Sequence, residues 1–174
     1  MRCLIVSASM GAGHDGVARE LAGRLGVTGH HAEIVDLLDL LPLRLGAILS
    51  AFYSGMVRYT PWLYELVYRV FFISHRRQPT VSPVVTLALP GLRRTVWRYR
   101  PDTVVSTFHL AAQAVGRLRQ HDGLDAPTAV VLVDFAVHRL WLHPGNDLYL
   151  CSHPAAARAV RAGLRRPARA SGPV

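Results

Sequence analysis

Three histidines and one aspartate are the residues of this sequence best suited to chemistry, because each follows a short apolar run typical of a buried strand. A neutral imidazole can remove a proton from a hydroxyl near neutral pH, and a carboxylate can orient the imidazole. The carboxyl ends of parallel strands meet at one edge of a sheet, where ligands bind in open α/β folds. We therefore predict a site at this edge. Its members are His14, His109, Asp134 and His138.

The spacing around Asp134 bears on the roles of these residues. Asp134 and His138 are four residues apart, which suits an Asp–His pair on one turn, and Trp141 follows His138 by three residues, so the two could share a face. A metal centre of Asp134, His138 and His143 has no tight ligand pattern, so we expect no metal. His14 could also cap a helix through local hydrogen bonds, and one sequence does not decide between these roles.

The loop after the first apolar run contains a glycine pattern. Gly11, Gly13 and Gly16 match the G-x-G-x-x-G pattern of dinucleotide-binding folds, and Asp36 lies 20 residues further on. However, His14 places an ionisable side chain at the position where a pyrophosphate would be bound by backbone N–H groups alone. An NAD(P)-binding oxidoreductase fragment is therefore one alternative function.

Five apolar runs, separated mostly by helical patterns, predict an α/β fold with a mostly parallel sheet and helices on both faces. The expected strands are residues 3–7, 32–36, 103–107, 129–133 and 148–151. Helices are expected after the glycine loop, over residues 109–119, and from Pro154 onward, because proline suits a first helical turn.

Residues 43–99 interrupt this alternation and predict a helical insertion. Eight of the 14 aromatic residues lie between Phe52 and Phe72, with arginines interleaved among them, and this composition suits a membrane interface. The other interpretation is a helical layer packed on the sheet with its arginines in solvent. The residues assigned to the candidate membrane surface are Phe52, Tyr53, Arg58, Trp62, Tyr64 and Arg69.

The net charge of +9 comes from arginine alone, since all 20 cations are arginines against 11 acids. Arginine binds planar oxyanions through two parallel hydrogen bonds, so phosphate-bearing partners fit this balance. More than half of the charge lies in residues 151–174, which hold five arginines and no acid. No nucleic-acid recognition motif accompanies the charge, so we expect no nucleic-acid partner.

The composition excludes a disordered chain and a disulfide scaffold, since 51% of the residues are hydrophobic and 18% are charged. The charge-free apolar stretch between Arg44 and Arg58 is 13 residues long, whereas a membrane span needs about 20. The two cysteines, Cys3 and Cys151, lie in strand-like runs. We expect a reducing compartment and no signal peptide.

Motifs spread over almost the whole chain form one ordered set. They are Ser7-Ala-Ser-Met-Gly-Ala-Gly-His14, Val35-Asp-Leu-Leu-Asp39, Pro61-Trp-Leu-Tyr64, Pro101-Asp102 with Ser106-Thr-Phe-His109, and Asp134 with His138, Trp141 and Asp147-Leu-Tyr149. In this order they resemble the monogalactosyldiacylglycerol synthase-like glycosyltransferases, a family similar to the processive diacylglycerol glycosyltransferases. The resemblance implies a GT-B enzyme with two facing Rossmann-like domains, of which this chain is the N-terminal, acceptor-binding half.

The resemblance also implies an activity and its residues. A hexose would move from a UDP-sugar, a co-substrate rather than a cofactor, to a diacylglycerol-type lipid in glycolipid biosynthesis. His14 and Asp134 would be catalytic, with His14 as the general base on the acceptor hydroxyl. The substrate-binding residues implied are Ser9, Gly11, Gly13, His109, His138 and Trp141. The candidate membrane surface of the insertion would also bind the acceptor. The protein would be cytoplasmic and peripheral on the inner face of the plasma membrane, against an anionic lipid surface.

Domain boundaries follow from the same resemblance. Residues 1–164 would form the acceptor domain and residues 165–174 would begin a linker to a C-terminal donor domain that this chain lacks. We expect little or no transfer without that domain, which a separate polypeptide could supply. A non-catalytic lipid- or nucleotide-binding module is the alternative function.

Overall fold

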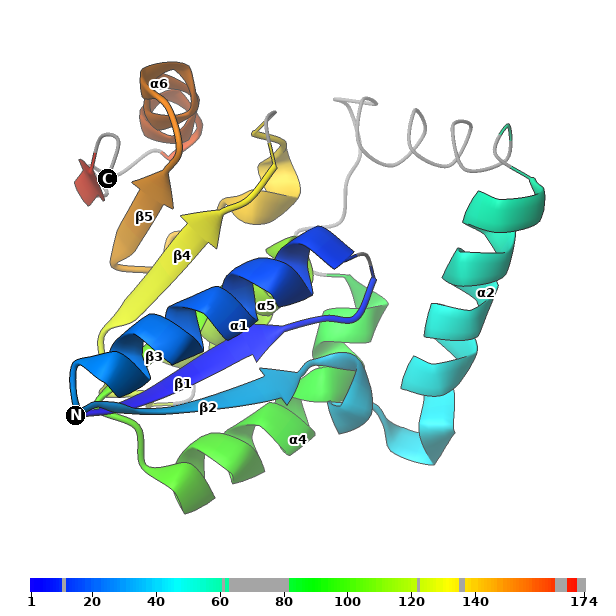
Figure 1. The fold of residues 1–174 in the computed structure, drawn as a ribbon, viewed down its shortest axis with the longest axis horizontal. Helices are drawn as coiled ribbons and strands as arrows, with labels where there is room; N and C mark the ends of the chain where they lie inside the picture. Colours follow the sequence, from blue (N-terminus) through cyan, green and yellow to red (C-terminus); the bar gives the residue numbers. More distant parts are fainter. Residues whose placement is uncertain are drawn as a thin grey trace.

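A sheet of six parallel strands runs through the part of the chain that the computed structural model describes. The described residues are 1–10, 12–60, 62, 82–121, 123–134, 137–164 and 169–171. The strands are β1 (Arg2–Ser7), β2 (His31–Asp36), β3 (Thr103–Ser106), β4 (Thr128–Leu132), β5 (Leu148–Cys151) and β6 (Arg169–Ser171). Their order across the sheet is β2-β1-β3-β4-β5-β6 (Figure 1).

Helices occupy the connections between these strands, which confirms the predicted α/β fold. The α-helices are α1 (Ala12–Val27), α2 (Leu45–Tyr59), α4 (Pro83–Tyr99), α5 (His109–His121) and α6 (Pro154–Gly163). Three single turns of 3-10 helix are η1 (Leu38–Leu40), η2 (Pro42–Arg44) and η4 (Arg139–Trp141).

The strand order reverses between β1 and β3. From β1 the chain passes through α1 to β2 on one side, whereas from β3 it continues to β4, β5 and β6 on the other side. At such a switch point the loops after the two central strands diverge and leave a crevice at their carboxyl ends. The fold therefore favours ligand binding at the loops that follow Ser7 and Ser106.

Successive residues of β1 point to opposite faces of the sheet and pack against different helices. Cys3 and Ile5 are buried in a cluster with Ala18 of α1, whereas Leu4 and Val6 are buried in a larger cluster with residues of α4 and α5. The sheet therefore has helices on both faces, as the sequence predicts (Figure 1).

The segment predicted as a helical insertion, residues 43–99, has two described parts of different character. α4 packs on the sheet through Val85, Ala88 and Leu92, which are fully buried. This part matches the interpretation of a helical layer on the sheet. Pro61 and residues 63–81 lie outside the described residues.

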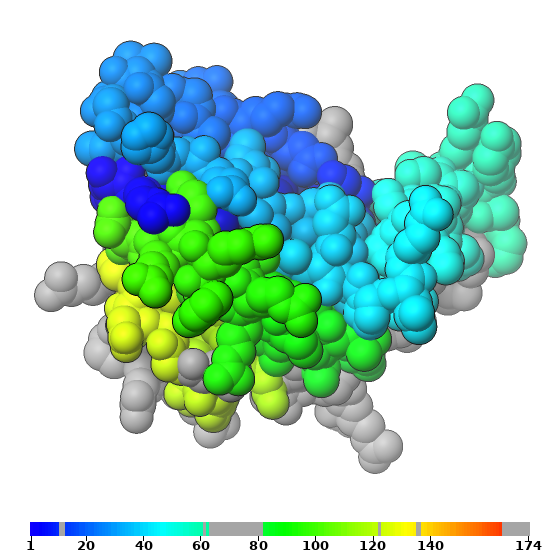
Figure 2. All heavy atoms as spheres, turned by 90° about the horizontal axis from the view of Figure 1, so that it is seen from below, coloured from blue at the N-terminus to red at the C-terminus, as the bar shows by residue number. Residues whose placement is uncertain are grey.

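α2 stands at the edge of the described fold (Figure 1). Leu45 and Leu49 pack against the core, whereas Ile48 and Phe52 are exposed. Figure 2 shows this helix, in cyan to teal, projecting beyond the rest of the body. None of the described helices is both long enough and apolar enough to cross a membrane.

β6 is an element that the sequence does not predict, since residues 165–174 have the composition of a linker. Its three residues pair in parallel with Leu148, Tyr149 and Leu150 of β5. The sequence Arg-Ala-Ser contains no apolar run, so the strand is defined by backbone pairing rather than by a hydrophobic pattern.

Candidate functional site

His14 connects the two loops that diverge at the switch point. It lies in the first turn of α1, and its Nδ1 atom is 2.9 Å from the carbonyl oxygen of Thr107, the residue after β3. Because a carbonyl oxygen can only accept, Nδ1 donates this hydrogen bond and Nε2 of the neutral ring carries the lone pair. The ring packs edge-on against Phe108, with 4.8 Å between ring centroids. The predicted base is therefore held in one orientation and one tautomer.

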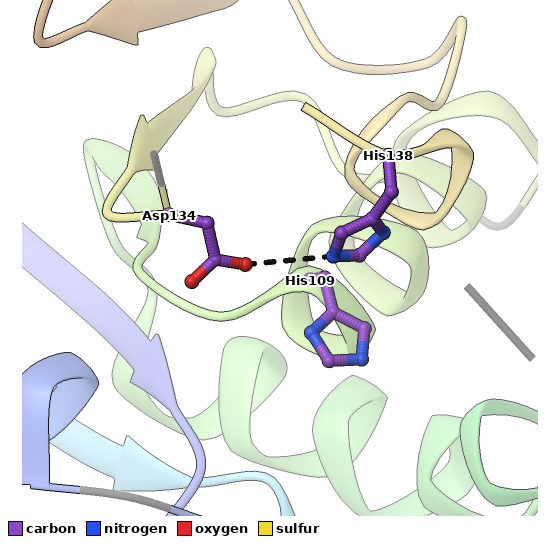
Figure 3. Close-up of side chains that lie close together, drawn as sticks. All are labelled: His109, Asp134 and His138. Carbon is purple, nitrogen blue, oxygen red and sulfur yellow. Dashed lines mark ion pairs between the residues drawn. The ribbon is translucent and has the colours of Figure 1, made fainter. Parts of the chain in front are cut away.

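Asp134 faces the lone-pair nitrogen of His14 from the loop after β4. Its Oδ1 lies 3.8 Å from His14 Nε2. Its Oδ2 lies 3.4 Å from His138 Nε2, and Figure 3 shows this second contact. Oδ2 also accepts a 2.8 Å hydrogen bond from Trp141 Nε1. Burial by itself raises the pKa of the Asp134 carboxyl, but the hydrogen bonds and the nearby histidines bring that pKa below its usual range. Asp134 is therefore ionised at neutral pH.

His109, the first residue of α5, lies beside this pair (Figure 3). Its ring centroid is 5.1 Å from that of His138. Burial, followed by the neighbouring His138, lowers the pKa of His109 to about 3, so its imidazole is neutral at physiological pH. The structure thus confirms that the loops after β1, β3 and β4 bring their histidines and Asp134 together.

The rest of the loop after Asp134 is held by buried hydrogen bonds. Trp141 is fully buried, so it supports Asp134 from behind rather than lining the surface as a substrate contact. The backbone N–H of His143 donates to the hydroxyl of Tyr149 at 2.8 Å, and that hydroxyl donates to the His143 carbonyl at 2.9 Å. His143 therefore belongs to the support of the loop.

Two polar residues that the sequence analysis does not identify complete this support. Gln113 of α5 donates from Nε2 to the carbonyl oxygens of Leu140 and Leu142, at 2.9 and 3.1 Å. Asn146 donates from Nδ2 to the carbonyl oxygen of Ala112 at 2.9 Å. A glutamine inside an otherwise apolar helix face is the sequence signal that could have identified Gln113.

Two aspartates close the loop after β1. Asp15 accepts hydrogen bonds from the hydroxyls of Ser7 and Ser9, each 3.1 Å long. Asp36 accepts hydrogen bonds from the backbone N–H groups of Ser9, at 3.0 Å, and Leu38, at 2.8 Å. Both oxygens of Asp36 therefore bind backbone, whereas the NAD(P) alternative requires this carboxylate to bind a ribose.

The described glycines of the loop pattern leave open space at the start of α1. The helix begins at Ala12, so Gly13 lies in its first turn. A Cβ atom added at Gly13 or at Gly16 would meet nothing within 4 Å, so packing does not require glycine at either position. Gly11 lies outside the described residues.

α2 contacts this loop through one face and exposes an apolar stripe on the opposite face. The hydroxyl of Ser50 donates to the carbonyl oxygen of Ser9 at 3.3 Å and so ties the helix to the loop after β1. Ile48, Phe52 and Tyr59 share one helix face and are 60%, 63% and 74% exposed; we call these three residues the α2 stripe.

The predicted membrane or acceptor surface partly coincides with this stripe. Phe52 belongs to it, and Trp62 lies just beyond the helix and is also exposed. Tyr53 is partly exposed, and the guanidinium of Arg58 lies over the ring of Tyr59, 5.5 Å from its centroid. Two further residues of the prediction, Tyr64 and Arg69, lie outside the described residues.

A separate cavity of about 910 Å³ opens at the amino-terminal edge of the sheet. Arg93 and Trp97 of α4 and Arg117 of α5 line it, together with the segments before β3 and β4. It contains none of the clustered histidines. The cluster remains the better candidate site, because it lies at the switch point and its polar groups converge.

Comparison with known proteins places this site in a family context. Residues 14–169 match the family model of monogalactosyldiacylglycerol (MGDG) synthase, which confirms the resemblance predicted from the sequence. A processive diacylglycerol beta-glucosyltransferase of Bacillus thuringiensis (strain Al Hakam) is 28% identical over 152 residues. One of Bacillus cereus (strain B4264) is 28% identical over 158 residues. Each match covers 85% of this chain and 38% of the relative, so the chain spans well under half the length of these relatives.

Proposed function

Because this chain belongs to the monogalactosyldiacylglycerol synthase family, we propose that it forms the acceptor-binding half of a membrane-associated glycosyltransferase. The reaction moves a hexose from a UDP-sugar to the hydroxyl of a diacylglycerol-type lipid, a step of glycolipid biosynthesis. The observation that carries this proposal is the orientation of His14, whose Nε2 opens at the switch point beside an ionised Asp134.

His14 is the general base in this proposal. As the acceptor oxygen bonds to the anomeric carbon of the sugar, its proton passes to Nε2 of His14. The bond from that carbon to the UDP phosphate oxygen breaks, and UDP leaves with the bonding electrons. An ionised carboxylate has no proton to donate, so Asp134 leaves the lone pair of Nε2 available to the hydroxyl.

Asp134 supports the charge that forms on His14. The protonated ring has two N–H groups, and an acceptor faces each of them, since the Thr107 carbonyl lies at Nδ1 and Asp134 Oδ1 lies at Nε2. A carboxylate close to an imidazolium favours its charged form. Ser9, Gly13, His109 and His138 would line the acceptor and phosphate side of the same crevice.

The α2 stripe and Trp62 form the proposed membrane surface. Exposed aromatic and aliphatic side chains on one helix face, with Arg58 beside them, suit the boundary between lipid headgroups and acyl chains. The hydrogen bond from Ser50 to Ser9 ties α2 to the loop that leads to His14, and Ser50 lies on the opposite face of the helix from the stripe. We place the protein at the cytoplasmic face of the plasma membrane, on anionic lipid.

The donor sugar needs a further binding domain in this proposal. The relatives are more than twice as long as the region that matches, and a nucleotide-sugar-binding domain is the part that a GT-B enzyme requires beyond its acceptor half. We propose that the described residues have little transferase activity until such a domain faces the crevice.

A chimera tests the proposed function directly. Residues 1–164 of this chain would replace the matching N-terminal region of the Bacillus cereus relative, and transfer from UDP-glucose to diacylglycerol in anionic vesicles would be measured. We expect transfer, and we expect His14→Ala to lower kcat by about 10²- to 10⁴-fold with vesicle binding unchanged. His31→Ala, at the opposite edge of the sheet, is the control and should retain activity.

Two results would contradict the proposal. One is a folded chimera that binds UDP-glucose and vesicles but transfers no sugar. The other is full activity of the His14→Ala chimera, which would leave the described residues with lipid binding alone.

A further inference from the structure

We infer that His109, Asp134 and His138 form a binding site for a divalent transition-metal ion of the Zn²⁺ class. Each of the three residues offers one ligand atom, and these atoms all lie within 4.8 Å of one another (Figure 3). They come from two different loops, after β3 and after β4, which the sheet holds together.

The spacing of two of the ligands already matches a metal site. Asp134 Oδ2 and His138 Nε2 are 3.4 Å apart, and ligands of a tetrahedral Zn²⁺ at bond lengths of about 2.0–2.1 Å are separated by about 3.4 Å. His109 supplies the third atom from the start of α5. The ligand atoms lie within 4.8 Å of one another, so the metal-bound arrangement requires the His109 side chain to move toward the pair.

The chemistry of the donors selects the class of ion. Two imidazole nitrogens and one carboxylate oxygen suit Zn²⁺, Co²⁺ or Ni²⁺, whereas Mg²⁺ and Ca²⁺ prefer oxygen alone. The single negative charge of Asp134 offsets part of the charge of the ion.

The hydrogen bonds around Asp134 are compatible with its binding a metal ion. Trp141 Nε1 donates to Oδ2 and fixes the carboxylate, as outer hydrogen bonds do around metal ligands. The other oxygen, Oδ1, faces His14. Three protein ligands with a further position open are typical of sites where the ion exchanges water or substrate. The sequence pairs His143 with Asp134 and His138 as a possible third ligand, but in the structure His143 supports the loop and His109 lies beside the pair.

A bound ion has one consequence that rests on the proposed function. It would engage Asp134, the carboxylate that faces His14 Nε2. Zn²⁺ would therefore remove this contact of His14 and inhibit sugar transfer. Metal binding itself requires neither acceptor nor donor, so it is tested separately from the transferase activity.

The test is a titration of the tag-free 174-residue chain with Zn²⁺ in competition with a chromophoric chelator. We expect one ion per chain, and we expect His109→Ala, Asp134→Asn and His138→Ala each to weaken binding by at least about tenfold. His31→Ala is the matched control, because His31 is an exposed histidine outside the cluster, and it should leave the affinity unchanged. Binding that is absent in the unmodified chain, or equally strong in the three variants, would overturn the inference.

Cobalt provides a second measurement that uses only the unmodified chain, so its result does not depend on whether the variants fold. Co²⁺ bound to the unmodified chain should give the intense visible absorption of a four- or five-coordinate site, and Zn²⁺ should abolish it by displacement. Weak absorption typical of six-coordinate, largely hydrated Co²⁺ would contradict a site with three protein ligands.

Discussion

The indole N–H of Trp141 donates a 2.8 Å hydrogen bond to Oδ2 of Asp134, and this bond fixes which carboxylate oxygen faces His14. Trp141 is fully buried and is itself packed among residues of β4, β5 and α6. The orientation of Asp134 is therefore set by the core of the domain, although Asp134 itself lies at the edge of the crevice.

Trp141→Phe should lower the transferase activity without a matching loss of acceptor binding. The variant keeps the aromatic packing but removes a hydrogen bond to a charged group, so Asp134 can turn away from His14. We expect kcat of the chimera to fall by about 10- to 100-fold with KM nearly unchanged. Tyr149→Phe is the control, because it removes buried hydrogen bonds of the same cluster without touching Asp134. Similar losses of kcat in both variants would show that Trp141 acts through general stability only.

Glycine-to-alanine substitutions in α5 and α1 should change stability in opposite directions. A Cβ atom at Gly116 of α5 would lie 2.5 Å from His143 Nδ1 and 2.9 Å from Asn146 Nδ2, so Gly116→Ala should destabilise the fold by about 1–3 kcal/mol. A Cβ atom at Gly23 of α1 would meet nothing within 4 Å, so Gly23→Ala should stabilise it by up to about 1 kcal/mol. Urea unfolding of both variants measures the difference, and equal effects would contradict the close packing of α5 against the loop at His143.

The sequence predicts the convergence of the site, because the carboxyl ends of parallel strands must meet at one edge. Apolar runs identify β1, β3 and β4, and the parallel order of these strands is enough to place His14, His109 and Asp134 at the same edge. The family resemblance adds the expected reaction and the expected role of each residue. The convergence at one edge is confirmed because it depends on strand order and on side-chain type alone, whereas the catalytic roles remain predictions.

Other parts of the site have no sequence signal. The acceptor for His14 Nδ1 is the backbone carbonyl of Thr107, and any residue could provide it. The choice of His109 over His143 beside Asp134 depends on how the loop folds around Tyr149, which hydrophobic periodicity does not describe. β6 is likewise determined by backbone pairing with β5 rather than by composition.

The stability of the fold should fall as the pH drops from about 6.5 to about 4, in part because of His143. Burial, followed by the positive charges of His121 and Arg117, lowers the pKa of His143 to about 4. The backbone N–H of Gly145 donates to His143 Nδ1 at 3.1 Å, so the folded state requires the neutral ring. Between these pH values the unfolded chain binds the proton and the folded chain does not, so the free energy of unfolding rises with pH.

Urea unfolding at several pH values measures this dependence. One proton contributes a slope of at most about 1.4 kcal/mol per pH unit, and His143→Gln should reduce the slope in the window from pH 6.5 to 4. His31→Gln, at an exposed histidine, should leave the slope unchanged. An unchanged slope in His143→Gln would show that the ring of His143 is not held neutral by the fold.

Removal of the α2 stripe should weaken membrane binding more than an equal change elsewhere on the surface. The variant Phe52→Ser with Tyr59→Ser replaces two exposed aromatic side chains that would insert at the lipid interface. Each buried aromatic contributes about 1.5–3 kcal/mol, so vesicle affinity should fall by at least about tenfold. The matched control is Leu87→Ser with Trp97→Ser, which removes exposed apolar side chains of α4.

Sedimentation with anionic vesicles at low and high salt distinguishes the forces involved. Because salt screens charges but not apolar insertion, binding through the α2 stripe should persist at high salt, while the contribution of Arg58 should decline. An equal loss of vesicle affinity in the α2 and α4 variants would contradict the assignment of the α2 stripe as the membrane surface. Binding that disappears entirely at high salt would show that arginines alone hold the protein on the membrane.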